Sequence, residues 1–213
     1  MRSDNLIDSI GNTPLVELPS LSLKEEVQIF AKLEGANPTG SVKDRIARGM
    51  IQAAEKAGLL SSEKTILEPT SGNTGISLAM VTQRLGYKFT AVMPDNVSKE
   101  RSDLLEAYGA EIIYSPGEDG SNGSILMAKE MAKRDNKYFM LYQYGNEENP
   151  RAHYETTGPE IYKDVPEITH FVAGLGTGGT LMGVGRYLKE VNPKIEVIAA
   201  APEVDDRIQG LRS

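Results

Sequence analysis

The chain has 213 residues, a hydrophobic fraction of 39% and no low-complexity run, so it is long enough for one large or two small globular domains and is not a disordered protein. Its formal net charge of −7, with lysine and arginine dispersed along the sequence, argues against a nucleic-acid surface and favours small-molecule or protein partners. Because it has no cysteine and only two histidines, disulfides, thiolate nucleophiles and Cys-ligated metals are excluded, and we expect no metal site.

Short runs rich in β-branched and aromatic residues alternate with helical patterns. The runs predict strands at 14–18, 28–33, 65–70, 89–94, 111–115, 139–144, 169–174 and 196–201. The patterns between them predict helices near 41–57, 74–85, 98–108, 121–134 and 180–190. This alternation indicates βαβ units and an α/β protein, with parallel sheets covered by helices on both faces.

Two further stretches concern domain organisation. The polar, turn-rich residues 144–162 follow a strand and precede fresh βα units, so we place a crossing between two domains there. The last expected strand is followed by PEVDDRIQGLRS (202–213), which offers neither a covering helix nor another strand. The sequence therefore predicts two domains, the second of them incomplete, in a chain that is truncated on its C-terminal side.

The segment NPTGSVKDR (37–45) places a lysine, Lys43, in the first turn of an expected helix. Residues 37–40 are turn formers, and Ser41 followed by Asp44 resembles a capping box, so the helix should begin near Ser41. Helix N-termini favour negative charge, and a lysine there costs roughly 0.3–1 kcal/mol at an exposed site. Most such lysines point into water. The alternative is a lysine that bonds to a carbonyl cofactor and so loses its simple ammonium charge.

Two glycine-rich loops lie where open α/β sheets bind ligands, beyond the carboxyl ends of strands. The first, TSGNTG (70–75), offers helix N-terminal N–H groups together with the side chains of Thr70, Ser71, Asn73 and Thr74. These groups suit a small carboxylate. A polar βα turn that binds nothing is the alternative, and the loop alone leaves both open.

The second loop, GLGTGGT (174–180), can bind a phosphate, because its glycines permit close backbone approach and Thr177 and Thr180 add hydroxyls. It lacks the Gly-Lys-Ser/Thr of a Walker A loop. It does match G-x-G-x-x-G, with Glu203 about two dozen residues later, so a dinucleotide-binding oxidoreductase is an alternative. A packing turn without a ligand is another.

A phosphate loop, a carboxylate loop and a helix-start lysine are together what a pyridoxal phosphate enzyme needs. In this interpretation Lys43 forms the Schiff base, residues 174–180 hold the cofactor phosphate and residues 70–74 hold the amino-acid carboxylate. Once substrate displaces it, Lys43 becomes a neutral amine that can remove the Cα proton. A dinucleotide-binding protein would leave Lys43 unexplained.

Five motifs occur in an order and spacing that one known family shares. They are GNTPLV (11–16), KLEGANPTGSVKDR (32–45), EPTSGNTGISLA (68–79), YQYGNEENPRAHYETTGPEI (142–161) and GLGTGGT (174–180). With them, nearly the whole chain resembles the cysteine synthase, or O-acetylserine sulfhydrylase, family of fold-type II pyridoxal phosphate enzymes. The resemblance implies two doubly wound α/β domains: a smaller mobile domain at 36–145, and a larger domain formed by 1–35 and 146–213 that is incomplete here.

The resemblance also implies roles for individual residues. Lys43 would be the Schiff-base lysine and general base, and Asn73 would bind the ring hydroxyl of pyridoxal 5'-phosphate. The cofactor phosphate would be bound by Gly176, Thr177, Gly178, Gly179 and Thr180. The substrate carboxylate would be bound by Thr70, Ser71, Asn73, Thr74 and Gln143. The implied reaction is β-replacement on O-acetylserine or O-phosphoserine with a sulfur donor, which gives L-cysteine.

Arg212 bears on the choice of substrate. B-type cysteine synthases resemble this chain at IQGLRS (208–213), whereas A-type enzymes usually carry glycine in place of Arg212. An arginine near the leaving group could bind a phosphate bidentately, which would suit O-phosphoserine, and a surface arginine is the alternative. In this family a serine from a later segment meets the pyridine nitrogen of the cofactor, and the resemblance gives that residue no counterpart here.

The remaining expectations concern partners and location. The resemblance implies a homodimer with small-molecule substrates, and the polar start, MRSDNLIDSI, with no apolar run long enough to span a membrane, predicts a cytoplasmic protein. Two further alternatives are an inactive fragment or paralogue that binds a full-length synthase, and a cystathionine β-synthase or serine/threonine dehydratase-like enzyme. TSGNTG and Gln143 favour cysteine synthase over those related enzymes. His153 and His170 are expected to be structural rather than catalytic.

Overall fold

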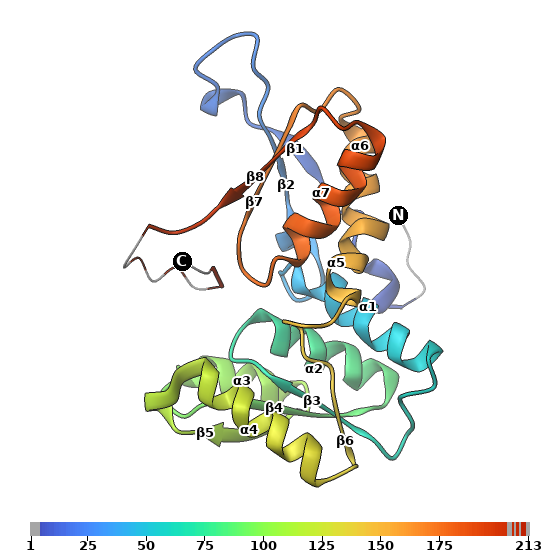
Figure 1. The fold of residues 1–213 in the computed structure, drawn as a ribbon, viewed down its shortest axis with the longest axis vertical. Coiled ribbons are helices and arrows are strands. Elements are labelled where there is room, and N and C mark those ends of the chain that lie inside the picture. The colour runs from blue at the N-terminus through green and yellow to red at the C-terminus, as the bar shows by residue number, and fades with distance from the viewer. Residues whose placement is uncertain (1–4, 204–205, 207, 209, 212–213) are drawn as a thin grey trace. The chain divides into compact units, whose positions relative to one another are not determined.

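The computed structural model describes residues 5–203, 206, 208 and 210–211. The chain consists of two compact units, each shown in Figure 1. The first unit is formed by Met1–Val42 with Pro150–Ser213, and the second unit is Lys43–Asn149. The division into a smaller mobile domain at 36–145 and a larger domain formed by 1–35 and 146–213 stays a prediction, because it includes a motion of the smaller domain.

The predicted strands and helices are present, with shifts of no more than two residues at their ends except in one strand: the strand predicted at 139–144 ends at Met140. The strands are β1 (Leu15–Glu17), β2 (Phe30–Lys32), β3 (Thr65–Pro69), β4 (Lys88–Pro94), β5 (Glu111–Ser115), β6 (Tyr138–Met140), β7 (His170–Gly174) and β8 (Glu196–Ala200). The α-helices are α1 (Lys43–Lys56), α2 (Asn73–Leu85), α3 (Lys99–Ala107), α4 (Gly120–Arg134), α5 (Glu148–Ala152), α6 (Gly158–Asp164) and α7 (Gly179–Val191). A π-helical turn, η5 (His153–Thr157), joins α5 to α6.

The second unit is built on a parallel sheet with the strand order β5-β4-β3-β6. The chain runs outward from β3 through α2 to β4 and through α3 to β5, and then returns through α4 to β6 on the other side of β3. Right-handed crossovers therefore place α2 and α3 on one face of the sheet and α4 on the other, where α4 packs against all four strands (Figure 1). The direction of winding reverses between β3 and β6, and ligands of open α/β sheets bind at the carboxyl end of such a reversal.

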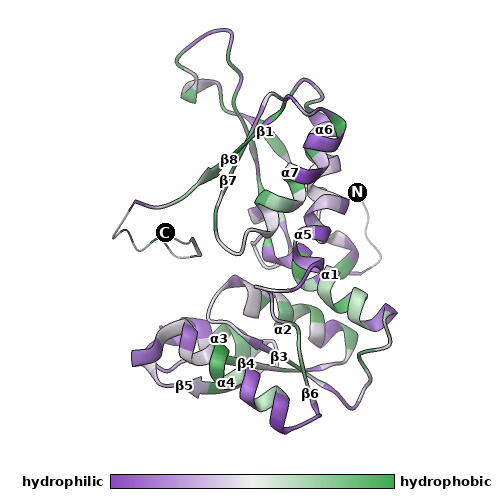
Figure 2. Ribbon diagram, viewed as in Figure 1, coloured by the Kyte–Doolittle hydropathy of each residue, from purple (hydrophilic) through white to green (hydrophobic). Residues whose placement is uncertain are grey.

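Apolar strands form the core of the second unit, and the hydropathy colouring in Figure 2 shows this for parts of β3 and β4. Every residue of β3 is buried, as is every residue of β4 after Lys88. Leu67, Val92 and Ala128 form a cluster that joins these strands to α4. Because both faces of the central strands are covered, their sequences are continuous apolar runs rather than alternating patterns.

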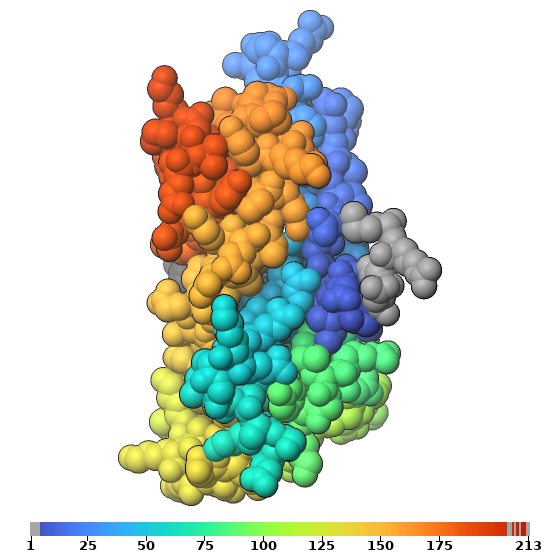
Figure 3. Space-filling view, turned by 90° about the vertical axis from the view of Figure 1, so that its right-hand side faces the viewer, coloured from blue at the N-terminus to red at the C-terminus, as the bar shows by residue number. Residues whose placement is uncertain are grey.

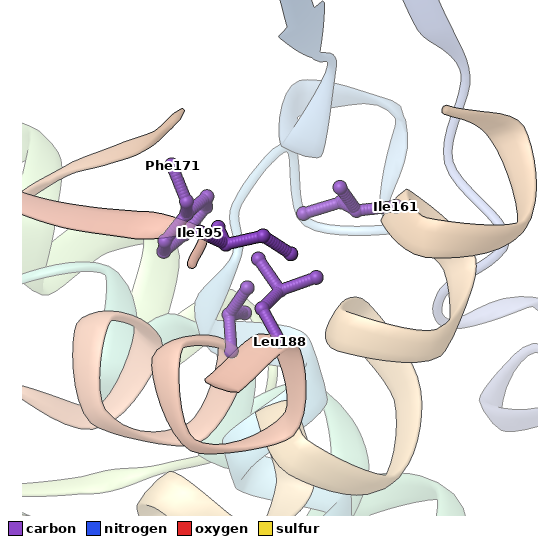
Figure 4. Packing of buried hydrophobic residues seen from close by; sticks show 5 residues of the cluster. Ile161, Phe171, Leu188 and Ile195 are labelled. Atoms are coloured by element: carbon purple, nitrogen blue, oxygen red, sulfur yellow. The ribbon is translucent and has the colours of Figure 1, made fainter. Parts of the chain in front are cut away.

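The core of the first unit lies around α7. β7 and β8 pair in parallel, and α7 is the crossover between them. The buried cluster drawn in Figure 4 joins α6, β7, α7 and the segment before β8, and consists of Ile161, Phe171, Val184, Leu188 and Ile195. This core anchors α7, whose first turn completes the glycine-rich loop at 174–180.

β1 and β2 differ from the predicted parallel pattern, because they pair antiparallel with Leu15 opposite Lys32. The residues between them contain only a 3-10 turn, Pro19–Leu21, so the helical crossover that parallel neighbours need is not available. The connection between the two strands projects from the body of the first unit in Figures 1 and 3, and it exposes Leu21, Leu23 and Val27.

The stretch 144–162 also differs from the prediction of a turn-rich segment, because α5, η5 and α6 occupy most of it. The prolines that indicate turns, Pro150 and Pro159, each lie in the first turn of a helix. At the start of α5 the missing N–H of Pro150 costs no helical hydrogen bond. Pro159 follows η5 directly, since Thr157 and Gly158 are both helical, so it lies where the π-helical turn passes into α6. None of the helices that the structure describes is long and apolar enough to cross a membrane.

Candidate active site

The loops that follow β3 and β6 meet at the reversal in the sheet of the second unit. β3 ends at Pro69 and leads into TSGNTG, and β6 ends at Met140 and leads to Gln143. Since β3 and β6 are parallel neighbours, both loops leave the sheet at the same edge. A direct hydrogen bond joins them, in which the Thr74 hydroxyl donates to Oε1 of Gln143 over 2.7 Å. The TSGNTG loop and the segment at Gln143, which are far apart in the sequence, therefore form one cluster of polar side chains.

Thr70 folds the TSGNTG loop onto the start of α2. Its Oγ1 accepts the backbone N–H groups of Gly72 at 3.4 Å and of Gly75 at 3.2 Å. A Cβ on residue 75 would lie 2.9 Å from the methyl carbon of Thr70, so this close approach requires glycine. From α3, Nη1 of Arg101 donates to the carbonyl of Ser71 over 3.1 Å. Thr70 within the loop and Arg101 from α3 therefore both stabilise the conformation of the loop.

The start of α2 supplies the anion-binding character of this cluster. α2 begins at Asn73, its N-cap residue is Gly72, and Thr70 Oγ1 accepts one N–H of its first turn, that of Gly75. Asn73 is exposed, Ser71 is half-buried and Thr74 is buried. N–H groups at the positive end of a helix dipole, together with hydroxyls and an amide, suit a carboxylate.

Gln143 is held at three points. Its backbone N–H donates to Oε1 of Glu68 over 2.9 Å, and its carbonyl accepts from Nδ2 of Asn149 over 2.9 Å. Its side-chain Oε1 accepts from Thr74. Because the oxygen of the amide is used in this way, the Nε2 end is the one that can donate to a ligand.

Lys43 is the first residue of α1. The helix buries its apolar face, which includes Ile46, and ends at Lys56. Gly58 follows with a φ of +69°, which allows the N–H of Leu59 to bond to the carbonyl of Ala54 over 2.9 Å. Lys43 is half-buried, and burial lowers the pKa of its ammonium group from the usual value. A lowered pKa increases the fraction of neutral amine, which is the form that attacks a carbonyl group.

The loop at 174–180 connects β7 to α7 in the first unit. Gly178 has φ +85°, which a residue with a side chain rarely adopts, and α7 begins at the next residue. Gly176 is required for close packing, because a Cβ there would lie 2.3 Å from the carbonyl oxygen of Gly210. The loop presents hydroxyls and N–H groups at a helix N-terminus and contains no acidic residue, which are the properties of a phosphate site.

Thr180 is held by a histidine that the sequence did not assign to the site. Nε2 of His153 lies 3.2 Å from Oγ1 of Thr180, and its Nδ1 lies 2.9 Å from Oγ1 of Thr157. His153 is buried and begins η5, and π-helical turns are frequent at functional sites. α7 can approach this turn because residue 183 is glycine, where a Cβ would lie 2.0 Å from the carbonyl oxygen of Pro150.

The predicted site residues thus fall into two groups. The second unit contains Lys43 at the start of α1 and, at the β3–β6 edge, Thr70, Ser71, Asn73, Thr74 and Gln143. One loop of the first unit contains Gly176, Thr177, Gly178, Gly179 and Thr180. Arg212 lies outside the described residues. Within the described part of the chain, no group of three or more His, Cys, Asp or Glu side chains could hold a metal ion.

Comparison with known proteins identifies the family. The family model described as "Pyridoxal-phosphate dependent enzyme" matches residues 6–212. A cysteine synthase of Staphylococcus aureus is 46% identical over 209 residues, which are 97% of this chain and 67% of that protein. This chain belongs to the pyridoxal-phosphate dependent enzyme family. The predicted resemblance to cysteine synthases is therefore confirmed.

Two solved structures confirm the fold class. An O-ureido-L-serine synthase matches with a TM-score of 0.94 and 41% identity, over 100% of this chain and 71% of that one. A hydrogen sulfide-producing enzyme from Fusobacterium nucleatum matches with a TM-score of 0.92 and 42% identity, over 99% of this chain and 72% of that one. The chain therefore has the α/β fold of these enzymes and spans about seven tenths of their length.

Proposed function

We propose that this family member is a cysteine synthase, which carries out β-replacement on O-acetylserine or O-phosphoserine with a sulfur donor to give L-cysteine. The observation that carries the proposal is the Thr74–Gln143 hydrogen bond at the reversal of the sheet, since it forms a carboxylate site from amide, hydroxyl and N–H donors. The 46% identity to a cysteine synthase across 97% of the chain supports the same choice.

Pyridoxal 5'-phosphate is the proposed cofactor, and the residues present fit it. Residues 176–180 offer backbone N–H groups and two hydroxyls for the phosphate, and a Cβ at residue 176 would collide with the chain. Asn73, exposed at the start of α2, offers an amide for the ring hydroxyl. Lys43 offers an amine of lowered pKa for the aldehyde.

The bound cofactor would supply an electron sink, which allows the Cα–H bond of an amino acid to break. Lys43 would take that proton at its Nζ atom, because burial keeps more of its amine neutral than in an exposed lysine. The TSGNTG loop and Gln143 would bind the α-carboxylate and so fix Cα in one orientation for proton transfer. The loop at 176–180 would hold the phosphate through N–H groups and hydroxyls.

Formation of L-cysteine from O-acetyl-L-serine and sulfide tests this proposal. We expect turnover by the wild-type chain supplied with pyridoxal phosphate, and none by Lys43→Ala. Lys56→Ala is the matched control, because Lys56 is an exposed lysine at the other end of α1. A folded, cofactor-loaded wild-type chain that forms no cysteine would rule the proposal out.

The choice between the two serine esters depends on Arg212 and stays a prediction, because that residue lies outside the described part of the chain. An arginine beside the leaving group would favour a phosphate through bidentate hydrogen bonds. Steady-state comparison of both donors in wild type and Arg212→Ala tests it. Selective loss of O-phosphoserine turnover supports the role, and turnover that is absent or unaffected contradicts it.

The proposal also includes a cytoplasmic homodimer, as the resemblance to cysteine synthases implies. Sedimentation equilibrium of the purified chain measures its mass directly. A mass twice that of the 23.2 kDa chain supports the dimer, and the mass of a single chain contradicts it.

A further inference from the structure

Glu68 is a fully buried carboxylic acid that lies just before the TSGNTG loop. It belongs to β3, and its side chain is 0% exposed. Its Oε2 accepts the backbone N–H of Tyr142 over 2.7 Å, and its Oε1 accepts the N–H of Gln143 over 2.9 Å. One carboxylate thus binds two consecutive backbone donors from the segment that follows β6.

These two bonds continue the pairing of β3 with β6 beyond the strands. The N–H of Leu141 still bonds to a backbone carbonyl, that of Leu67, over 3.2 Å. At Tyr142 the backbone enters the left-handed region, with φ +58°, which residues with a side chain rarely adopt. The N–H groups of Tyr142 and Gln143 are bound by the Glu68 side chain instead of the backbone of β3. The carboxylate therefore fixes the point at which the chain leaves the sheet.

A carboxylate at this position accepts from both N–H groups, but its burial has a cost. Burial raises the pKa of Glu68 to about 7, although the two N–H bonds act in the opposite direction, so its ionised form is costly in the folded chain. An apolar residue would avoid that cost but leave two N–H groups without an acceptor. A glutamine would fill the same volume, but it would offer one oxygen and turn an NH₂ group toward the second N–H.

The residue that these bonds control is Gln143. Its backbone is fixed by Glu68 and its side-chain oxygen by Thr74, and both of these partners flank or belong to the TSGNTG loop. We propose that Glu68 is a positioning residue for the substrate α-carboxylate, which holds Tyr142 and Gln143 so that the Gln143 amide and the TSGNTG loop bind the same carboxylate. This inference rests on the proposed function and deepens it.

A double-mutant cycle tests the inference on the full chain loaded with pyridoxal phosphate. We expect Glu68→Gln to raise the KM for O-acetyl-L-serine about tenfold, with kcat changed less than about threefold, because the lost interaction binds substrate and transition state alike. In a Gln143→Ala background the same substitution should have no further effect on KM, because Glu68 acts through Gln143. Glu111→Gln, an exposed glutamate on β5, is the matched control and should leave KM unchanged.

A second readout does not depend on activity. We expect amide hydrogen exchange at Tyr142 and Gln143 to be faster in the unliganded Glu68→Gln chain, while exchange in α4 stays unchanged. If the wild-type chain showed no turnover but exchange increased as expected, the proposed function would fail and the positioning of the 142–143 backbone by Glu68 would stand.

Three results would overturn the inference. They are additive effects of Glu68→Gln and Gln143→Ala on KM in an active enzyme, unchanged exchange at residues 142 and 143, and a fall in kcat with KM unchanged. If Glu68→Gln does not fold, Glu68→Asp replaces it in the cycle, because it keeps a carboxylate but is too short to reach both N–H groups. Failure of both variants to fold would assign Glu68 to the fold alone and would also overturn the inference.

Discussion

Nε2 of His153 lies 3.2 Å from Oγ1 of Thr180, so a buried histidine of the π-helical turn η5 contacts a hydroxyl of the glycine-rich loop. The other ring nitrogen of His153 is bonded to Thr157, which fixes the plane of the imidazole. With its proton on Nε2, His153 donates to Thr180 Oγ1 and leaves the hydroxyl proton of Thr180 for an anion, and a preorganised donor binds an anion at a smaller entropic cost.

For this reason we expect His153→Ala to weaken binding of pyridoxal phosphate by about three- to tenfold, the size of one hydrogen bond to an uncharged group. Absorbance titration of the chain with the cofactor measures the dissociation constant. His170→Ala is the control, because His170 is exposed and contacts Thr169 and Glu196 instead. Equal dissociation constants for His153→Ala and wild type would contradict this role.

The Thr74–Gln143 hydrogen bond predicts a difference between two substitutions of Thr74. Thr74→Ser keeps the hydroxyl that donates to Gln143, whereas Thr74→Val keeps the shape and loses the donor. We expect Thr74→Val to raise the KM for O-acetyl-L-serine about tenfold and Thr74→Ser to stay within about threefold of wild type, because only the former leaves the Gln143 oxygen without its donor. Steady-state kinetics at fixed sulfide compares them, and equal KM values would show that the bond does not matter for binding.

Gly183 determines how closely α7 approaches the segment at Pro150. A Cβ at residue 183 would lie 2.0 Å from the carbonyl oxygen of Pro150, which is backbone and cannot move aside cheaply. We expect Gly183→Ala to lower the free energy of unfolding by about 1–3 kcal/mol, as overpacking does. Met182→Ala, at an exposed neighbouring position, should change it by less than about 0.5 kcal/mol. Denaturant unfolding measures both, and equal midpoints would contradict the close packing.

The raised pKa of Glu68 predicts how stability depends on pH. Its carboxyl has a pKa of about 7 in the folded chain against an ordinary 4.5. Between these values the folded chain retains a proton that the unfolded chain has released, so the contribution of this group falls as pH rises and is constant above about pH 7. The difference between a pKa of 4.5 and one of about 7 corresponds to a change of about 3 kcal/mol in the free energy of unfolding.

Urea unfolding between pH 4.5 and 8 measures this contribution, with Glu68→Gln as the reference that cannot titrate. We expect the free energy of unfolding of wild type, relative to the variant, to decrease across this range. Curves that run parallel would show that Glu68 does not titrate within it.

Much of the fold could be predicted because local sequence signals agree with the secondary structure that the chain forms. The apolar runs of β3 and β4, the glycines that end helices, such as Gly58, and the loops after strands each have a local signal. The antiparallel pairing of β1 and β2 was missed because strand direction depends on the connection. The helices at 148–164 were missed because Pro150 lies in the first turn of α5, where proline is tolerated, and Pro159 lies directly after the π-helical turn η5.

The candidate site could be predicted only in part, for a related reason. Thr70, Thr74 and the 174–180 loop belong to short motifs, whereas the supports of these residues come from distant segments. Glu68 and Gln143 are 75 positions apart, and His153 and Thr180 are 27 apart. The sequence around a single buried histidine or glutamate does not indicate which distant residue it contacts. These contacts could therefore be found only in the structure.

Lys43 is the residue proposed to bind the cofactor covalently, and reduction of the cofactor–lysine bond tests this role. The purified chain is mixed with pyridoxal phosphate, its visible absorption is recorded, and the sample is reduced with borohydride, digested and analysed by peptide mass. We predict a visible band that borohydride abolishes and a pyridoxyl label on Lys43, with no label at that position in Lys43→Ala. A folded chain without the band, or a label spread over exposed lysines with Lys43 unmodified, would contradict this role.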